Sequence, residues 1–350
     1  MNYGTLIESL KAIGKPTLTV EMPGGTRILL LPHGGRVLGL FGAGDEENYY
    51  WTNPALGSAA TAEAYYGSGD WQNSGGDRTW LAPELDLFFP KYPDTDFSGY
   101  VQPRQLDPGS YKIEDSDGTV RMVNRLSVEL YRMKTGADLE MRKWVTPAAN
   151  PLRYEKNLPL PPGVVYAGYT QHTALAILGG DTARVGLWNL IQMPHRGLLT
   201  IPLYARSEPR IYFGTIEENA LRVTQRAIRW RMAGKEEQKI GVRATAITGR
   251  VGYLYAAGEV ATLIIRNIAV NPSGDYVDVP YNEPDDLGYC VQACNVNSRW
   301  GVFSELEYHV PAIGAGTGCD CCEDVSQVWA FRGPAGAIDK VMVALLGIEE

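Results

Sequence analysis

Two carboxyl groups and an imidazole alternate along the segment Trp300–Pro311, WGVFSELEYHVP, at a spacing that suits acid–base chemistry. If this segment is a β-strand, Glu305, Glu307 and His309 project from one face, because successive side chains point to opposite sides. Groups about 6.5–7 Å apart along a strand would be costly to bury unless they line a wet cleft or bind a cation. We predict Glu305 and Glu307 as catalytic residues and His309 as a substrate-binding residue. The alternative is a solvated strand face without a binding role.

The segment Gly75–Glu84, GGDRTWLAPE, combines groups that bind polyhydroxylated rings. Asp77 supplies a hydrogen-bond acceptor, Arg78 supplies a fixed fork of donors, and Trp80 offers a flat face for the C–H side of a sugar. The two glycines allow a tight turn before these residues. We predict Asp77, Arg78 and Trp80 as substrate-binding residues, with a structural turn and an Asp–Arg pair as the alternative.

Two further segments carry isolated candidates. His172 lies in the strand-like segment 169–178, YTQHTALAIL, among apolar and small residues, where a histidine can also be purely structural. Trp188, Gln192 and His195 lie in the segment 186–197, GLWNLIQMPHRG, and are predicted to line the same cleft.

The cysteines cluster in the last fifth of the chain, an arrangement unlike a secreted disulfide framework. Four thiolates could bind a structural zinc ion, although the spacing is not that of a standard zinc knuckle. Free buried thiols are the alternative, and a divalent cation held by the acidic row of the segment 300–311 is another. The four candidate zinc ligands are Cys290, Cys294, Cys319 and Cys321.

The elements that position these residues are predicted to be mostly strands. Glycine-containing turns indicate hairpins at Gly24-Gly25 and Asp117-Gly118, and alternation over 228–232 and 239–244 indicates strands with one wet face. Helical periodicity is scarce: a short helix is expected over 5–13, another over 326–331, and helix or strand over 338–346. We therefore predict an all-β fold with few short helices, in a single domain over residues 1–350.

Composition excludes several classes of partner. The 350 residues are 45% hydrophobic, enough for a large core, and carry a net charge of −8. An acidic chain repels phosphate backbones, so we expect no nucleic-acid partner. No apolar run reaches the roughly 20 residues that span a bilayer, so we expect no membrane partner. The N-terminal segment 1–16 lacks signal-peptide features, and we expect a cytoplasmic location.

Three of these segments together resemble the galactose mutarotase-like (aldose 1-epimerase) superfamily. Thr170-Gln171-His172-Thr173 resembles a T-N-H-T strand, Gly301 to Glu305 followed by Pro311 resembles a G-x-x-x-E strand with a downstream proline, and Arg78 falls where the family often has a sugar-binding arginine. The motifs look closer to an uncharacterised bacterial branch than to true galactose mutarotases. The resemblance implies an antiparallel β-supersandwich.

The resemblance also implies a reaction without an organic cofactor. Glu305 would take the proton from the anomeric hydroxyl while His172 protonates the ring oxygen, so that the sugar ring opens and closes as the other anomer. The ligand would be a small-molecule sugar or an oligosaccharide. A glycosidase or lyase that uses Glu305 and Glu307, and a non-catalytic carbohydrate-binding protein, remain alternatives.

Overall fold

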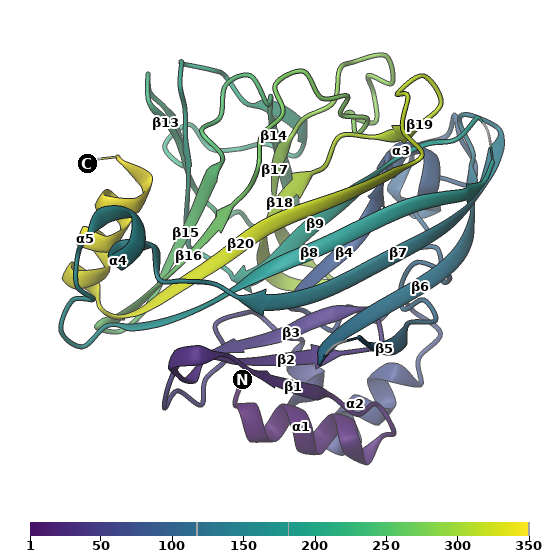
Figure 1. Ribbon diagram of the computed structural model, residues 1–350. Coiled ribbons are helices and arrows are strands. Elements are labelled where there is room, and N and C mark those ends of the chain that lie inside the picture. Colours follow the sequence, from purple (N-terminus) through teal and green to yellow (C-terminus); the bar gives the residue numbers. More distant parts are fainter. Residues whose placement is uncertain (117, 181, 349–350) are drawn as a thin grey trace.

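The computed structural model describes residues 1–116, 118–180 and 182–348, and β-strands dominate its architecture. The strands form two large sheets that lie one behind the other, with the long strands of the second sheet in front in Figure 1. Every strand pair within the described residues is antiparallel, which confirms the predicted all-β class. Both predicted glycine hairpins form, although Asp117 of the second turn lies outside the described residues.

The first sheet carries the acidic strand. Its order is β1-β2-β3-β4-β9-β18-β17-β14-β11, and the short β19 also pairs with β9. In chain order its strands are β1 (Leu18–Glu21), β2 (Arg27–Leu31), β3 (Arg36–Phe41), β4 (Asp77–Ala82), β9 (Arg184–Pro194), β11 (Arg210–Phe213), β14 (Gln238–Val242), β17 (Val291–Ser298), β18 (Gly301–His309) and β19 (Ile313–Gly314).

The second sheet has the order β12-β13-β10-β15-β16-β20-β8-β7-β6-β5. Its members are β5 (Lys112–Ser116), β6 (Thr119–Leu130), β7 (Thr135–Pro147), β8 (Val165–Gly179), β10 (Leu198–Pro202), β12 (Leu221–Val223), β13 (Ala227–Arg231), β15 (Arg250–Ala257), β16 (Val260–Asn267) and β20 (Cys321–Pro334).

The helices are short and lie at the outside of the sheets (Figure 1). The N-terminal helix expected over 5–13 is confirmed, and it packs with the second helix against β2 and β3. The segment 338–346 belongs to a helix that covers β16 and β20. The helices are α1 (Tyr3–Ala12), α2 (Ala59–Tyr66), α3 (Glu84–Leu87), α4 (Pro151–Lys156) and α5 (Ala335–Leu346), with 3₁₀ turns at Pro23–Gly25, Pro54–Gly57 and Phe97–Gly99.

Two sequence-based predictions of elements are wrong, and coverage of the outer faces explains both. The segment 326–331 is part of β20 instead of a helix, since it pairs with β16 and β8, and its apolar residues face both the core and α5. In β14, Lys239 was expected on a wet face but is 3% exposed, because loops cover the outer face of this strand. The alternation of β13 is as predicted, with Trp230 buried and Arg231 exposed.

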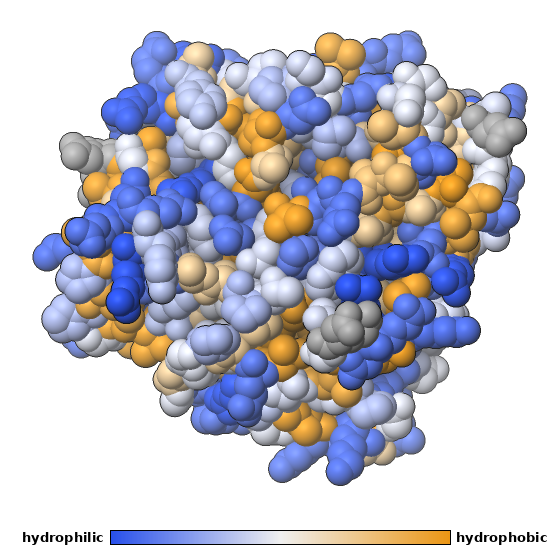
Figure 2. Space-filling view, viewed as in Figure 1, coloured by the Kyte–Doolittle hydropathy of each residue, from blue (hydrophilic) through white to orange (hydrophobic). Residues whose placement is uncertain are grey.

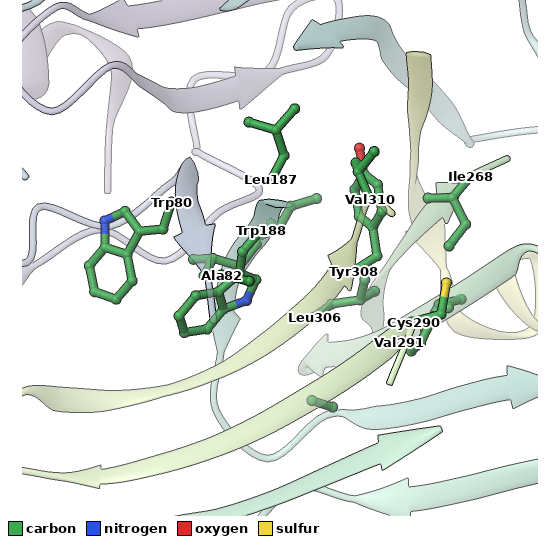
Figure 3. Packing of buried hydrophobic residues seen from close by; sticks show 14 of the residues in the cluster. Trp80, Ala82, Leu187, Trp188, Ile268, Cys290, Val291, Leu306, Tyr308 and Val310 are labelled. Carbon is green, nitrogen blue, oxygen red and sulfur yellow. The ribbon is translucent and has the colours of Figure 1, made fainter. Parts of the chain in front are cut away.

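The main core lies between the sheets and continues onto the outer face of the first sheet. Leu306 and Tyr308 of β18 are buried in it, and Figure 3 shows them beside Trp188 and Val310 of the same cluster. On the face seen in Figure 2, which lies over the front sheet of Figure 1, hydrophilic and hydrophobic residues are interspersed. Among the described residues, no helix combines the length and the apolar character needed to cross a membrane.

Candidate functional site

The acidic side chains of β18 face away from the second sheet, into a cavity on the outer face of the first. Ser304 accepts a hydrogen bond from Tyr253 of β15, and Tyr308 donates one to Asp324 of β20, so both residues face the second sheet. Glu305 and Glu307 alternate with them and therefore point outward. The cavity has a volume of about 90 Å³ and is lined by Trp71, Arg78, Trp80, Glu84, Phe97, Tyr100, Gln102, Trp188, Phe213, Glu237, Lys239, Tyr281, Cys294, Val296, Trp300, Phe303, Glu305 and Glu307.

Strand register assembles the floor of the cavity from residues far apart in the sequence. Directly opposed residues on neighbouring strands lie close together on one face of a sheet. One cross-strand row contains Lys239, Cys294, Glu305 and Gln192 from β14, β17, β18 and β9.

The next rows complete the floor. In the second row, Glu307 of β18 is opposite Leu190 of β9, which is opposite Arg78 of β4. A third row contains His309, Trp188 and Trp80.

Glu305 is held by donors from two neighbouring strands. Its Oε1 accepts a hydrogen bond of 3.0 Å from Arg78 Nη2 and one of 2.8 Å from Gln192 Nε2. Charge-assisted bonds of this kind stabilise the carboxylate form. The Arg78 guanidinium in turn lies 3.9 Å from the ring centre of Trp80, while its Nε has no hydrogen-bond partner within residues 1–116, 118–180 and 182–348.

Glu307 is a buried carboxyl group with one oxygen free. Trp188 Nε1 donates to its Oε2 at 2.8 Å, and Lys239 Nζ lies 3.3 Å from the same oxygen. Oε1 is buried and has no hydrogen-bond partner among the residues that the structure describes. Burial raises the pKa of Glu307 to about 7, with help from Glu305 and Glu84, although Lys239 opposes the shift. A carboxyl group in this environment exchanges a proton near neutral pH, as a general acid or base must.

Lys239 lies between two carboxyl groups. Its Nζ is 3.4 Å from Glu84 Oε2, and Glu84 also accepts hydrogen bonds from the hydroxyls of Tyr100 (2.5 Å) and Tyr281 (2.6 Å). Burial alone would lower the pKa of Lys239, but Glu307 and Glu84 together raise it above its usual range. The ammonium group therefore stays charged and forms ion pairs with both carboxyl groups.

Aromatic rings form the walls of the cavity. On one side, Trp71 packs against Trp80 and Trp300 with ring centres 5.5 and 5.4 Å apart. Trp80 also packs against Trp188 at 5.4 Å, and both are labelled in Figure 3. On the other side lie Phe97, Phe213, Tyr100 and Tyr281. Flat apolar walls above a polar floor are typical of sites for small ring-shaped ligands.

The structure does not bring His172 into this cavity. Its neighbours Gln171 and Thr173 face the first sheet, where both bond with Asn189 of β9. His172 therefore points to the outer face of the second sheet, where it stacks on Trp144 with ring centres 4.9 Å apart. The predicted pairing of His172 with Glu305 is wrong, because the two side chains lie on opposite outer faces of the sandwich.

Asp77 does not line the cavity, so its prediction as a substrate-binding residue is wrong. It precedes Arg78 in β4 and points to the opposite side, between the sheets. There it accepts hydrogen bonds from Lys143 Nζ (2.8 Å), Arg266 Nη1 (2.5 Å) and Tyr169 OH (2.9 Å). Burial opposes ionisation, but the two cations lower the pKa of Asp77. Its role is to join the two sheets.

Two other predicted histidines do not line the cavity. His195 follows the end of β9, and its Nε2 is 2.8 Å from Oδ1 of Asn295, a residue opposite Ser304 on the side of the first sheet that faces the second. His309 is 2% exposed and stacks under Trp188 at 5.5 Å, and burial holds the pKa of this imidazole well below its usual range. His309 thus supports Trp188 as a neutral ring.

The four cysteines considered as zinc ligands do not meet. Cys294 lies on β17 of the first sheet and Cys290 directly before it, whereas Cys319 and Cys321 are exposed in the loop before β20 and at its start. Ligand atoms of Cys294, Glu305 and Glu307 do lie within 4.8 Å of one another. Arg78 and Lys239 already pair with these carboxyl groups, and burial raises the pKa of Cys294 well above its usual range, so this group suits an ion-pair network better than a divalent cation.

Of the predicted site residues, Glu305, Glu307, Arg78, Trp80 and Trp188 line the cavity, and Gln192 bonds Glu305. Glu84 ends the GGDRTWLAPE segment, which was a usable signal, whereas Lys239 occupies an ordinary wet-face position of a strand pattern. Cys294 was a candidate only as a zinc ligand. The other lining residues carry no local signal: Trp71, Phe97, Tyr100, Gln102, Phe213, Glu237, Tyr281, Val296, Trp300 and Phe303.

Comparisons with known proteins give a family and a set of similar structures. A family model described as "Family of unknown function (DUF6786)" matches residues 1–350, and no curated protein matches the chain. Among solved structures, the chain is similar to a galactose mutarotase-like protein from Lactobacillus casei ATCC 334, with 10% identity, a TM-score of 0.49, and coverage of 90% of this chain and 99% of that chain.

Two further structures are similar at lower TM-scores. One is galactose 1-epimerase from Lactobacillus acidophilus NCFM, with 8% identity, a TM-score of 0.42, and coverage of 90% of this chain and 93% of that chain. The other is 4-alpha-glucanotransferase from Thermococcus litoralis, with 10% identity, a TM-score of 0.33, and coverage of 91% of this chain and 37% of that chain. These likenesses concern the arrangement of strands alone.

Proposed function

We propose that this chain, which belongs to the family of unknown function DUF6786, binds a sugar ring in the cavity and transfers protons on it. The observation that carries the proposal is the pair formed by Glu305 and Glu307 under aromatic walls. Glu305 is bonded by Arg78 and Gln192, whereas Glu307 has a free Oε1 and a pKa of about 7. A buried carboxyl group that holds a proton near neutral pH, beside a second carboxyl group, is suited to acid–base chemistry.

The reaction that this pair supports best is the interconversion of sugar anomers. Glu305, as the carboxylate, takes the proton from the anomeric hydroxyl, while Glu307, in its acid form, protonates the ring oxygen. The C1–O bond of the ring breaks, the open chain rotates about C1–C2, and the reverse transfers close the ring as the other anomer. Trp80 and Trp188 are buried, with Arg78 over one ring and Lys239 over the other, so the more exposed lining rings of Phe97 and Phe213 offer faces for the C–H side of the sugar.

Anomer interconversion can be measured directly by polarimetry or by exchange NMR on freshly dissolved hexoses. We expect catalysis by the native protein and a loss of about 100-fold or more in kcat/KM for Glu307→Gln and for Glu305→Gln, since each removes one proton-transfer group. Circular dichroism of each variant would confirm that it is folded.

His172→Ala is the matched control, because the histidine lies on the other face of the sandwich. We expect it to retain the activity of the native protein. Loss of activity in His172→Ala, or full activity in Glu307→Gln, would contradict the proposed assignment.

A further inference from the structure

The charged side chains that line the cavity carry an excess of carboxyl groups. Four are glutamates, Glu84, Glu237, Glu305 and Glu307, and two are cations, Arg78 and Lys239. Both cations are already paired: Arg78 with Glu305, and Lys239 with Glu84 and Glu307. Among the described lining residues, no cation is therefore free to form an ion pair with a ligand.

Glu237 differs from the other lining glutamates because it forms no ion pair within the described part of the chain. It lies two residues before Lys239 and is half-buried at the cavity. Its side chain accepts a hydrogen bond of 2.6 Å from Ser298 Oγ, and it forms no ion pair with any residue that the structure describes. A partly buried carboxylate without a counter-ion favours a positively charged neighbour.

Aromatic rings line the same cavity beside this carboxylate. Phe213 is opposite Lys239 in the strand register. Trp300 lies two residues after Ser298, which bonds Glu237, and its ring is already covered by the Arg299 guanidinium, 4.4 Å from the ring centre. Phe97 is 44% exposed at the opening and packs against Phe213 with ring centres 5.4 Å apart. The faces of aromatic rings attract an ammonium group, and a carboxylate beside them strengthens the attraction.

The carboxyl group on the floor of the cavity offers a second free position. Oε1 of Glu307 is buried there and has no hydrogen-bond partner among the described residues, so a polar group of the ligand can bond to it. We propose that the ligand is a sugar that carries a positively charged amino group, and that Glu237 with the ring of Phe213 forms the subsite for its ammonium. This inference rests on the proposed binding of a sugar ring.

The same charge distribution disfavours anionic sugars. A phosphate or a carboxylate on the ligand would be repelled by the glutamates, and binding it would require breaking an existing ion pair of Arg78 or Lys239. The subsite therefore predicts an order of affinity, with amino sugars first, neutral hexoses second and hexose 6-phosphates last.

Isothermal titration calorimetry at neutral pH tests this order with glucosamine, galactosamine and mannosamine against the parent hexoses and their 6-phosphates. We expect at least one amino sugar to bind about ten-fold more tightly than its parent hexose, a ratio typical of one cation–π or ion-pair contact. In Glu237→Gln, which keeps the shape of the side chain, the ratio should fall to about one. Glu236→Gln is the matched control, because this neighbouring glutamate is exposed and does not line the cavity.

Each result has a distinct meaning. Equal binding of amino sugars and parent hexoses, or a preference that survives in Glu237→Gln, would overturn the ammonium subsite while leaving the proposed binding of a sugar ring in place. Tightest binding by a 6-phosphate would also overturn it. If no sugar in the panel bound detectably, both the proposed function and the ammonium subsite would be overturned.

Discussion

At the scale of single residues, environment gives different roles to two chemically identical side chains of one strand. Glu305 receives two donors on one oxygen, whereas Glu307 is fully buried with one oxygen unbonded. The burial of Glu307 raises its pKa to about 7, which keeps a proton available near neutral pH. The same shift makes Glu307 a source of pH-dependent stability.

Glu307→Gln should change how stability depends on pH. The folded protein binds the Glu307 proton more tightly than the unfolded chain, whose carboxyl has the ordinary value of 4.5. The stabilisation from this proton is complete below the unfolded pKa and is lost as the pH rises through about 7. The free energy of unfolding of the native protein relative to Glu307→Gln should therefore fall over this window, by up to about 3 kcal/mol.

Urea unfolding of both proteins at pH 5 and at pH 8 measures this difference. Parallel behaviour of the two proteins at both pH values would show that Glu307 does not titrate in this window.

At the scale of elements, β14 shows how the covering of a strand decides what its residues do. Lys239 alternates with apolar residues as an ordinary wet-face lysine would, yet it is 3% exposed. Loops that carry Phe97, Tyr100 and Tyr281 cover it, so that the ammonium group pairs with Glu84 and Glu307 instead of water. The strand thus supplies the counter-charge for the acidic row of β18.

Lys239→Met should destabilise the protein by about 3–5 kcal/mol, because it leaves two buried carboxyl groups without their cation. Lys112→Met on the exposed edge strand β5 is the control and should change stability by less than about 0.5 kcal/mol. Adding Glu307→Gln to Lys239→Met should recover part of the lost stability, because one of the two unpaired buried carboxyl groups is removed. Chemical denaturation of the four proteins tests this, and equal stability of the two lysine variants would contradict the buried ion-pair network.

At the scale of the whole molecule, one buried carboxylate joins the two sheets. Asp77 extends from β4 of the first sheet and contacts Lys143 of β7 and Arg266 of β16 in the second. Because Asp77 and Arg78 are adjacent in one strand, the inter-sheet network and the cavity share the same backbone. Strand β4 therefore contributes both to the contact between the two sheets, through Asp77, and to the cavity, through Arg78.

Asp77→Asn should cost about 3–5 kcal/mol of stability at pH 7, because two buried cations lose their shared counter-ion. The pKa of Asp77 is lowered in the folded state, so its stabilisation is present above the unfolded value near 3.8 and is lost as the pH falls through the folded value. The difference between the native protein and Asp77→Asn should then shrink in acid.

Asp339→Asn on the exposed face of α5 is the control and should change stability by less than about 0.5 kcal/mol. Guanidinium unfolding at pH 7 and pH 3 gives the comparison. A pH-independent difference for Asp77→Asn would exclude the ionised carboxylate as its cause.

The sequence by itself determined the features that depend on neighbours along the chain. Alternation placed Glu305 and Glu307 on one face of β18, and glycines that favour positive φ fixed the hairpin at Gly24-Gly25. The scarcity of helical periodicity gave the all-β class. Period-two alternation also separates Arg78 from Asp77, but it does not say which of the two faces the cavity.

Only the tertiary structure decided which face of each strand is covered and which strands are neighbours. His172 and Glu305 both lie in alternating strands, but their sheets stack so that the two side chains point away from each other. Lys239, Cys294 and Glu305 meet through antiparallel register across β14, β17 and β18. Local sequence cannot specify this, because pairing and stacking depend on the packing of residues that are distant in the chain.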